Sequence, residues 1–277
     1  MKKILLKKYG YTPTSISGTF KFMINRAVRL LYKYINKEKY VNYNWFDSPL
    51  KLRDIKFITV DGYIFTGYDR DITYALRPEV SVLETVMRYV RDGITFIDVG
   101  AHIGGISIRV AKKVGKGKVI AVEPDPRNFT YLLKNIELNN IRNIIPIMTA
   151  LGSENGLARF KIFEESRLST FTNIHDRDSK LITEIYIPVM RLDELVRELE
   201  IDNVDIVKID VEGAEVDVLK GAVETLRKHR PILIIEIHGE EQYINTRKIL
   251  EDMNYRLEIL EEDRKIPWHM QTIAIPK

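Results

Sequence analysis

The sequence predicts a doubly wound α/β fold with a mostly parallel sheet, and two observations support this class. From about residue 79 onward, segments with strand periodicity and segments with helix periodicity alternate along the chain. Candidate strands such as "ILIIEI" (residues 232–237) are apolar almost throughout. Such strands are expected where helices cover both faces of a sheet.

The alternation predicts the order of the elements. We expect helices at 79–91, 103–114, 126–139, 214–229 and 241–253. We expect strands at 94–99, 118–123, 143–148, 204–210, 231–237, 255–260 and 271–276. Pro146 lies inside the third of these strands, and because proline cannot donate to a strand ladder, that strand should form an edge of the sheet.

A basic N-terminal extension, residues 1–75, precedes a main domain at 76–277. Residues 1–56 contain 13 Lys and Arg but only three Asp and Glu. Apolar spacing predicts an amphipathic helix at about 19–38, and the Asp61-Gly62 dipeptide predicts a β-hairpin at about 55–68. The basic face of the helix either is solvated while the helix packs on the body, or contacts an anionic membrane surface or nucleic acid through residues 1–40.

The alternation breaks between residues 150 and 203, which we interpret as an insertion. "LARFKIF" (157–163) and "EIYIPVM" (184–190) predict paired strands on either side of a polar loop at 164–179. A loop of that length is often functional.

Composition excludes several classes of protein. The chain of 277 residues has no cysteine, which excludes disulfides, thiolate zinc sites and cysteine nucleophiles. No apolar run approaches the length of a membrane span, and "MKKILLKKYG" lacks the apolar core of a secretory signal. We therefore expect a cytoplasmic protein, with peripheral contact at a membrane left open.

The stretch "FIDVGAHIGG" (96–105) places an acid and three glycines after a buried strand. Ligands of open α/β sheets bind outside the carboxyl ends of the strands. The spacing G-x-x-x-G-G differs from the dinucleotide pattern G-x-G-x-x-G, which disfavours a dinucleotide. By itself the glycine turn is equally consistent with a cofactor site and with plain packing between strand and helix.

The next strand adds a second acid at the same edge of the sheet. Glu123 follows "KVIAV", where a carboxylate can accept hydrogen bonds from both hydroxyls of a ribose. Asp125, directly before Pro126, can cap the following helix, which leaves Glu123 for a ligand. Together, the two acids and the glycine turn predict a nucleoside-containing cofactor without a pyrophosphate.

Five segments in order resemble the FkbM-type family of S-adenosyl-L-methionine-dependent methyltransferases. They are "FIDVGAHIGG", "VIAVEPDPRNFTYLLKNIELNN", "IPVMRLDEL", "VDIVKIDVEGAEVDVLKGA" and "PILIIEIHG". The resemblance covers roughly residues 78–260. It implies a Rossmann-like sheet of seven strands, the last antiparallel and the third at an edge, and O-methylation of hydroxyls on sugars, glycolipids or small metabolites.

The resemblance also implies a cofactor site. Asp98, Gly100 and Gly104 would surround the methionine half of S-adenosyl-L-methionine, and Glu123 would hold its ribose. Thr149 and Ala150 would border the adenine, with Pro124 in the same group. His102 stands where the family usually has Asn, and it either contacts the cofactor or has a structural role.

Candidate catalytic groups follow the fourth and fifth strands of this domain. In "DIVKIDVEGAE" (205–215), alternation places Lys208 and Asp210 on one face with Glu212 next in phase. A carboxylate there can accept the proton of an acceptor hydroxyl. The alternative is a structural Lys208–Asp210 ion pair, with Glu212 and Glu215 at the start of a helix. His238, in "IEIHG", is either a base, a substrate contact or structural. Acidic residues and His238 could also bind a divalent metal, but no tight spacing of ligands supports this, so we expect no metal.

Substrate contacts are expected from two further segments. The residues are Arg167, Ser169 and Thr170 in the insertion, and Trp268 and His269 in "KIPWHM", which would cap the acceptor pocket. Two other functions remain open: an RNA methyltransferase that grips phosphates with the basic arm, and a non-catalytic protein that holds the cofactor structurally. The acceptor is expected to be a small molecule, glycan or glycolipid rather than nucleic acid.

Overall fold

The structure is a computed structural model that describes residues 11–15, 55–67, 75, 80–163, 180–262 and 268–277. The predicted amphipathic helix at about 19–38 and the polar loop at 164–179 lie outside these residues. Within the described part of the chain, no helix is long and apolar enough to cross a membrane.

The centre of the molecule is a seven-stranded sheet with the order β12-β13-β11-β10-β4-β5-β6. The strands are β4 Thr95–Val99, β5 Lys118–Val122, β6 Ile144–Ile147, β10 Ile206–Ile209, β11 Ile232–His238, β12 Tyr255–Glu262 and β13 His269–Pro276. Neighbours from β6 through β11 pair in parallel, whereas β13 is antiparallel to both β11 and β12. This topology confirms the predicted fold class, including the single reversed strand and the edge position of β6, the strand that contains Pro146.

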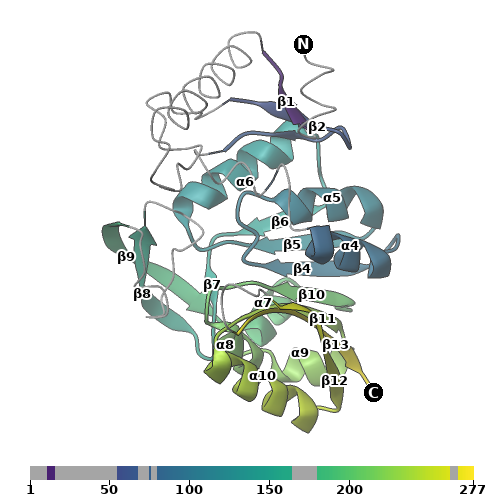
Figure 1. Cartoon of the computed structure of the whole chain (residues 1–277), viewed down its shortest axis with the longest axis vertical. Coiled ribbons are helices and arrows are strands. Elements are labelled where there is room, and N and C mark those ends of the chain that lie inside the picture. The colour runs from purple at the N-terminus through teal and green to yellow at the C-terminus, as the bar shows by residue number, and fades with distance from the viewer. Residues whose placement is uncertain (1–10, 16–54, 68–74, 76–79, 164–179, 263–267) are drawn as a thin grey trace, which may run out of the picture.

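Helices cover both faces of the sheet (Figure 1). They are α4 Val80–Tyr89, α5 Gly105–Val114, α6 Pro126–Leu138, α7 Leu192–Glu198, α8 Glu215–Lys220, α9 Val223–His229 and α10 Glu240–Asp252. Alternate strand residues supply two separate cores. Phe96, Ile206 and Ile234 pack with α4, α5 and α6, whereas Ile97 and Val207 pack with α7 to α10. The alternation of side chains across a strand explains this division.

The single helix predicted at 214–229 is wrong, because the structure has two short helices there. Gly221 separates them, and a Cβ at this position would lie 2.0 Å from the carbonyl oxygen of Gly152. The second helix, α9, is capped by a residue far away in sequence: the carboxylate of Asp193 in α7 accepts hydrogen bonds from the backbone N–H groups of Glu224 and Thr225. A local pattern could not reveal a cap supplied from another helix.

The insertion folds as a small sheet with the strand order β7-β9-β8. These strands are β7 Ala150–Leu151, β8 Gly156–Phe163 and β9 Leu181–Met190, and the antiparallel pairing of β8 with β9 confirms the prediction. Helix α7, which follows β9, was not predicted.

An N-terminal sheet lies against α5 and α6. Its strands are β1 Tyr11–Pro13, β2 Phe57–Thr59 and β3 Ile64–Phe65. The predicted hairpin is confirmed by the β2–β3 pairing, and β1, which was not predicted, pairs with β2. The buried Arg109 of α5 donates to the carboxylate of Asp61 in the hairpin turn at 2.7 Å. Phe57 and Phe65 belong to the same core as α4, α5 and α6.

Asn135 of α6 is the second link between the hairpin and the domain. Its side chain is fully buried; Oδ1 accepts from Thr66 N, and Nδ2 donates to the carbonyls of Thr66 and Ile103. Replacing Asn135 with Ala leaves three buried backbone groups without these partners, and we expect the free energy of unfolding to fall by about 3 kcal/mol. Urea denaturation measures this, with the exposed Asn203→Ala as the matched control; an equal, small effect in both variants would contradict the assignment.

Candidate active site

Polar residues of four strands, β4, β10, β11 and β13, lie on one face of the sheet. They gather at the end of the sheet where the parallel strands have their carboxyl ends, which we call the polar edge. Asp98 of β4 is paired in register with Lys208 of β10, which is paired with Ile234 of β11 on its other side. Because side chains alternate, Asp210 and Glu236, two residues further on, project from the same face. On β11 and β13, His238 lies opposite His269 in the antiparallel register. This face is apolar toward the amino ends of the strands and polar at their carboxyl ends.

Lys208 connects the acids of β4 and β10. Its Nζ lies 3.3 Å from a carboxylate oxygen of Asp98 and 3.3 Å from one of Asp210, and it donates to the carbonyl of Gly100. Burial alone would lower the pKa of this lysine, but Asp210, Asp98 and Glu236 outweigh it and raise the pKa. The ammonium group therefore stays charged. The Asp210 side chain is the more open of the two partners, at 30% exposed against 1% for Asp98.

Gly100 begins the turn after β4 at the point where this turn touches β10. Its φ is +79°, and a Cβ there would lie 1.8 Å from the backbone oxygen of Asp210. The backbone of the glycine turn and the end of β10 can approach this closely only without a side chain. Gly104, with φ +89°, is required for a different reason: a Cβ there would lie 2.7 Å from a methyl group of Leu132 in α6.

His102 adopts a left-handed backbone conformation in the middle of the turn. Its φ is +53°, a region in which Asn, Asp and His are several-fold enriched among residues other than glycine. The backbone therefore explains why His can replace the Asn that the resemblance leads one to expect. The N–H of His102 donates to Glu123 Oε2 at 2.7 Å. Contact between its imidazole and a cofactor stays a prediction.

Glu123 is buried where the glycine turn meets α6. Its other oxygen, Oε1, accepts hydrogen bonds from Asp125 N at 2.9 Å and from Asn128 Nδ2 at 3.3 Å. As predicted, Asp125 rather than Glu123 caps α6, by accepting from Arg127 N. Burial raises the pKa of Glu123 to about 7, with Asp125 adding to the rise while His102 opposes it. Each carboxylate oxygen can accept more than one hydrogen bond, so capacity for ribose hydroxyls remains.

The raised pKa of Glu123 predicts pH-dependent cofactor binding. If Glu123 holds the ribose as expected, the hydroxyls would donate to its ionised carboxylate, and affinity for S-adenosylhomocysteine should fall about tenfold between pH 8 and pH 6 as Glu123 takes up a proton. The stability of the ligand-free protein should depend on pH in the opposite sense. The pKa of Glu123 is about 7 in the folded protein and 4.5 for an ordinary Glu, so the folded state binds the proton more tightly than the unfolded state. The free energy of unfolding should therefore fall as pH rises toward and through 7. Calorimetry across this range on the wild type and on Glu123→Gln tests the assignment, and the same pH slope in both proteins would contradict it.

His238 lies among three carboxylates. Its Nδ1–H donates to Glu215 Oε1 at 2.9 Å, and its Nε2 lies 3.6 Å from Glu212 and 3.7 Å from Glu236. Glu215 is fully buried, and its Oε1 also accepts from Gly213 N. Burial would lower the pKa of His238, but the surrounding carboxylates outweigh burial and raise it to about 10. In this state the imidazole is protonated at neutral pH, so it is a donor and not a base.

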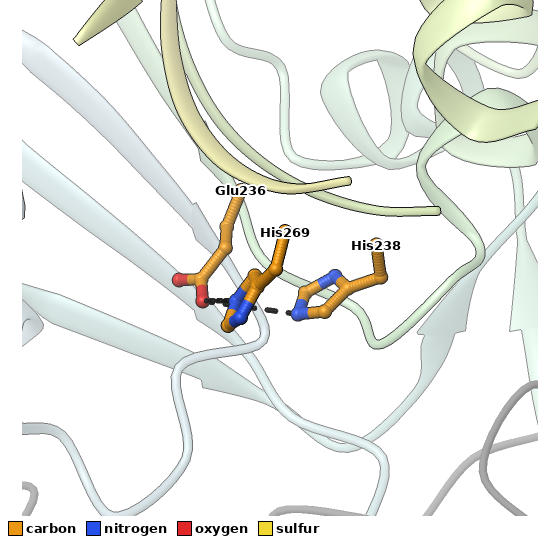
Figure 2. Close-up of side chains that lie close together, drawn as sticks. All are labelled: Glu236, His238 and His269. Atoms are coloured by element: carbon orange, nitrogen blue, oxygen red, sulfur yellow. Dashed lines mark hydrogen bonds and ion pairs between the residues drawn. The ribbon is translucent and has the colours of Figure 1, made fainter. Parts of the chain in front are cut away.

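His269, Glu236 and Trp268 complete this edge. Figure 2 shows His269 between Glu236 and His238: its Nε2–H donates to Glu236 Oε1 at 2.6 Å, and its ring stacks on His238 with centroids 4.8 Å apart. Trp268 precedes His269; its carbonyl accepts from Gly239 N, and its ring lies 5.9 Å from that of Tyr243. Trp268 is therefore next to the polar edge, as the prediction of a substrate contact requires.

The other predicted residues lie around this centre or outside the described part of the chain. Pro124 follows Glu123 at the edge. Thr149 and Ala150 are buried beyond β6, and Thr149 Oγ1 donates to the carbonyl of Pro188 in β9. Arg167, Ser169 and Thr170 fall on residues that the structure does not describe.

Sequence reasoning assigned no chemical role to Glu215 or Glu236, and it expected His269 only to cap the acceptor pocket together with Trp268. Glu215 was interpreted as part of a helix start, and the structure shows that it holds His238. Glu236 and His269 come together only because β13 is antiparallel to β11, which pairs residues 31 positions apart at His238 and His269. The alternation in "ILIIEIH" was the one signal for Glu236, since it places the acid in phase with His238.

The acidic residues at the strand ends fit S-adenosyl-L-methionine. Asp98 Oδ2 accepts from Ser107 Oγ at 2.5 Å, whereas Oδ1 is buried and has no hydrogen bond among the described residues, its contact with Lys208 being an ion pair at 3.3 Å. A carboxylate oxygen can accept more than one hydrogen bond, so Asp98 keeps capacity for the amino group of the cofactor. A second acid, Glu123, lies one strand away beside the glycine turn.

With this geometry, the chain is a Rossmann-like α/β domain with an acid-lined site at the carboxyl ends of its parallel strands. A sequence model described as "Methyltransferase FkbM domain" matches residues 98–257. The chain therefore belongs to the FkbM methyltransferase family. Membership of this family supports S-adenosyl-L-methionine as the cofactor of the site.

Individual relatives are more distant. The chain is 29% identical to hexuronic acid methyltransferase AglP of Haloferax volcanii over 68% of this chain and 74% of that protein. It is 25% identical to Methyltransferase 1 of Beauveria bassiana over 47% of this chain, spanning 59% of that protein's length. A crystal structure of methyltransferase FkbM from Methylobacillus flagellatus KT is 19% identical with a TM-score of 0.47, covering 73% of this chain and 54% of that chain. None of these similarities defines the acceptor.

Proposed function

We propose that the protein is an S-adenosyl-L-methionine-dependent O-methyltransferase acting on a hydroxyl of a sugar, glycolipid or small metabolite. The observation that carries the proposal is the position of Asp210. This carboxylate is held by Lys208 at 3.3 Å, adjoins the glycine turn and is partly open. The relative from Haloferax volcanii, a hexuronic acid methyltransferase by name, supports a sugar acceptor.

The residues that hold the cofactor divide between two strands. Asp98 and the turn at Gly100 and Gly104 would hold the methionine half, and Glu123 the ribose. Pro124, Thr149 and Ala150 would border the adenosine. When bound, S-adenosyl-L-methionine supplies an electrophilic methyl group on its sulfonium.

Asp210 is the candidate general base. The acceptor hydroxyl must lose its proton as it attacks, and a positioned carboxylate can accept this proton, which typically contributes 10²–10⁴ in rate. Lys208 fixes the carboxylate through the ion pair and orients its second oxygen. Holding the acceptor oxygen in line with the methyl group is the larger part of the task.

The remaining polar residues are candidates for holding the acceptor. Glu212 and the protonated His238 lie next to each other beyond Asp210, and Trp268 adjoins them. Arg167, Ser169 and Thr170 belong to the same proposal by resemblance. The N-terminal residues 1–40 are a candidate contact with an anionic membrane surface, where a glycolipid acceptor would lie.

The experiment is a transfer assay with labelled S-adenosyl-L-methionine. Acceptors are hexuronic acids, uronic-acid oligosaccharides, their lipid-linked forms and, as the competing class, RNA. We expect label in an ether linkage on the sugar, stable to mild base that cleaves methyl esters. Transfer to RNA alone, or label released by mild base, would contradict the proposal. Absence of turnover with intact cofactor binding would favour the non-catalytic alternative.

A further inference from the structure

The cluster of Glu236, His238 and His269 has the composition of a metal site (Figure 2). One ligand atom from each residue lies within 4.8 Å of the others. Two imidazoles and a carboxylate are the ligands that several first-row transition metals prefer. A second group, Asp210, Glu212 and His238, meets the same distance condition and shares His238 with the first.

The orientation of His238 is the independent observation. Metal-binding histidines almost always donate their other ring N–H to a carboxylate or carbonyl. Here Nδ1–H of His238 donates to Glu215 at 2.9 Å, and Glu215 is fully buried and itself fixed by Gly213 N–H. Glu215 Oε2 is buried and has no hydrogen bond among the described residues. The result is an imidazole held so that Nε2 faces Glu236 and Glu212.

The framework around these ligands is rigid. His238 and His269 are paired in register on two adjacent hydrogen-bonded strands, β11 and β13, and Glu236 precedes His238 by two residues on the same face. Metal–ligand bonds of about 2.1 Å in a tetrahedral site separate ligand atoms by about 3.4 Å. The present Glu236 contacts, 2.6 Å to His269 and 3.7 Å to His238, bracket this value. The ligand atoms are therefore spaced on the scale that one metal ion requires.

The local charge favours a cation. Asp98, Asp210, Glu212, Glu215 and Glu236 gather at one edge with Lys208 and the two histidines. Carboxylate oxygens of Glu212, Glu215 and Glu236 lie 2.9–3.7 Å from the ring nitrogens of His238 and create a negative potential there.

We propose that Glu236, His238 and His269 bind a divalent transition-metal ion, with Asp210 and Glu212 beside the open positions and Glu215 as a positioning residue. This reverses the expectation from the sequence that no metal is bound. That expectation weighed acidic residues and His238 as ligands but did not join His269 to them, because only the antiparallel register of β11 and β13 brings His269 to His238. Imidazole ligands favour zinc, iron or cobalt over magnesium or calcium.

A metal ion at this site could also take part in methyl transfer. This role rests on the proposed function. The ion would hold the acceptor hydroxyl and lower its pKa. The hydroxyl proton passes to the Asp210 carboxylate, a C–O bond forms and the C–S bond of the sulfonium breaks. The products are the methyl ether, S-adenosylhomocysteine and protonated Asp210, so atoms and charge balance.

The test is Co²⁺ binding to the full-length protein after dialysis against a chelator. We expect one ion per chain by calorimetry, with a visible absorption spectrum that Zn²⁺ abolishes. His269→Ala should weaken binding at least about tenfold, and Glu215→Gln should weaken it about 10- to 100-fold. The matched control is His229→Ala, since His229 ends α9 just before β11 begins, at the opposite edge of the sheet.

Two outcomes would overturn the metal site: no Co²⁺ or Zn²⁺ binding by the wild type, or unchanged affinity in His269→Ala. S-adenosylhomocysteine binding, measured on every variant, reports whether the domain is folded. If the cofactor binds and the metal does not, the metal site is refuted while the proposed function stands. If the metal binds and no acceptor is methylated with it, the proposed function fails by itself.

Discussion

Replacing Gly100 with alanine is expected to lower the free energy of unfolding by about 3 kcal/mol or more. Two effects act together at this position. The φ of +79° is strained for any residue with a Cβ, and the added Cβ would lie 1.8 Å from the backbone oxygen of Asp210. The overlap cannot be relieved by a side-chain rotation, because the added Cβ is fixed to the backbone and the oxygen of Asp210 belongs to the backbone of a central strand.

Gly93→Ala is the matched control for this substitution. Gly93 has a φ of +84°, nearly the same as Gly100, but nothing lies within 4 Å of the Cβ position. Its substitution therefore reports backbone strain alone, about 1–2 kcal/mol. Urea denaturation of both variants measures the difference, which is the contribution of the close approach between the glycine turn and β10. Equal losses would show that this approach does not constrain the site.

The Gly100→Ala variant should also lose affinity for S-adenosylhomocysteine, to the extent that it folds. The turn can relieve the overlap only by moving away from the end of β10, which displaces the backbone expected to line the cofactor site. The Gly93→Ala variant should bind as the wild type does, since Gly93 lies before β4 at the opposite edge of the sheet.

Asp210→Asn is expected to lower the rate of methyl transfer by 10²–10⁴ while cofactor affinity stays within a few-fold of the wild type. Asparagine keeps the size of the side chain and an oxygen that can accept from Lys208, but it cannot take the hydroxyl proton. A loss confined to kcat would identify Asp210 as the base.

The control for Asp210→Asn is Asp217→Asn. Asp217 lies on α8 and is 43% exposed in its ion pair with Lys220. Its substitution should therefore leave both cofactor affinity and the rate of methyl transfer unchanged. Full activity in Asp210→Asn would contradict the role of base and would shift attention to Glu212. Loss of cofactor binding in Asp210→Asn would instead assign Asp210 a structural role with Lys208.

The fold was predictable wherever its cause is local in the sequence. Apolar alternation identified the buried strands, and Pro146 identified the edge strand because a missing N–H excludes proline from the sheet interior. Asp61-Gly62 identified the hairpin. The break between α8 and α9 escaped prediction because its two causes, the carbonyl of Gly152 and the carboxylate of Asp193, come from other elements.

The residues of the candidate site also divide into those that local sequence predicts and those that only the tertiary structure reveals. Asp98, Glu123 and Asp210 were accessible from sequence, since each follows a strand and the carboxyl ends of parallel strands meet at one edge. The protonation of His238 was not, because it depends on carboxylates from β11, α8 and the turn before α8. The partnership of His238 with His269 depends on the antiparallel return of β13, which periodicity cannot place.

The central claim is that acids at neighbouring strand ends hold an adenosyl cofactor over the glycine turn, with Asp210 facing the transferred methyl group. A crystal structure of the complex with S-adenosylhomocysteine tests this claim most directly. We predict that the ribose hydroxyls bind Glu123, that the amino group binds Asp98, and that the sulfur faces Asp210. A ligand bound elsewhere, or a ribose without contact to Glu123, would contradict the account.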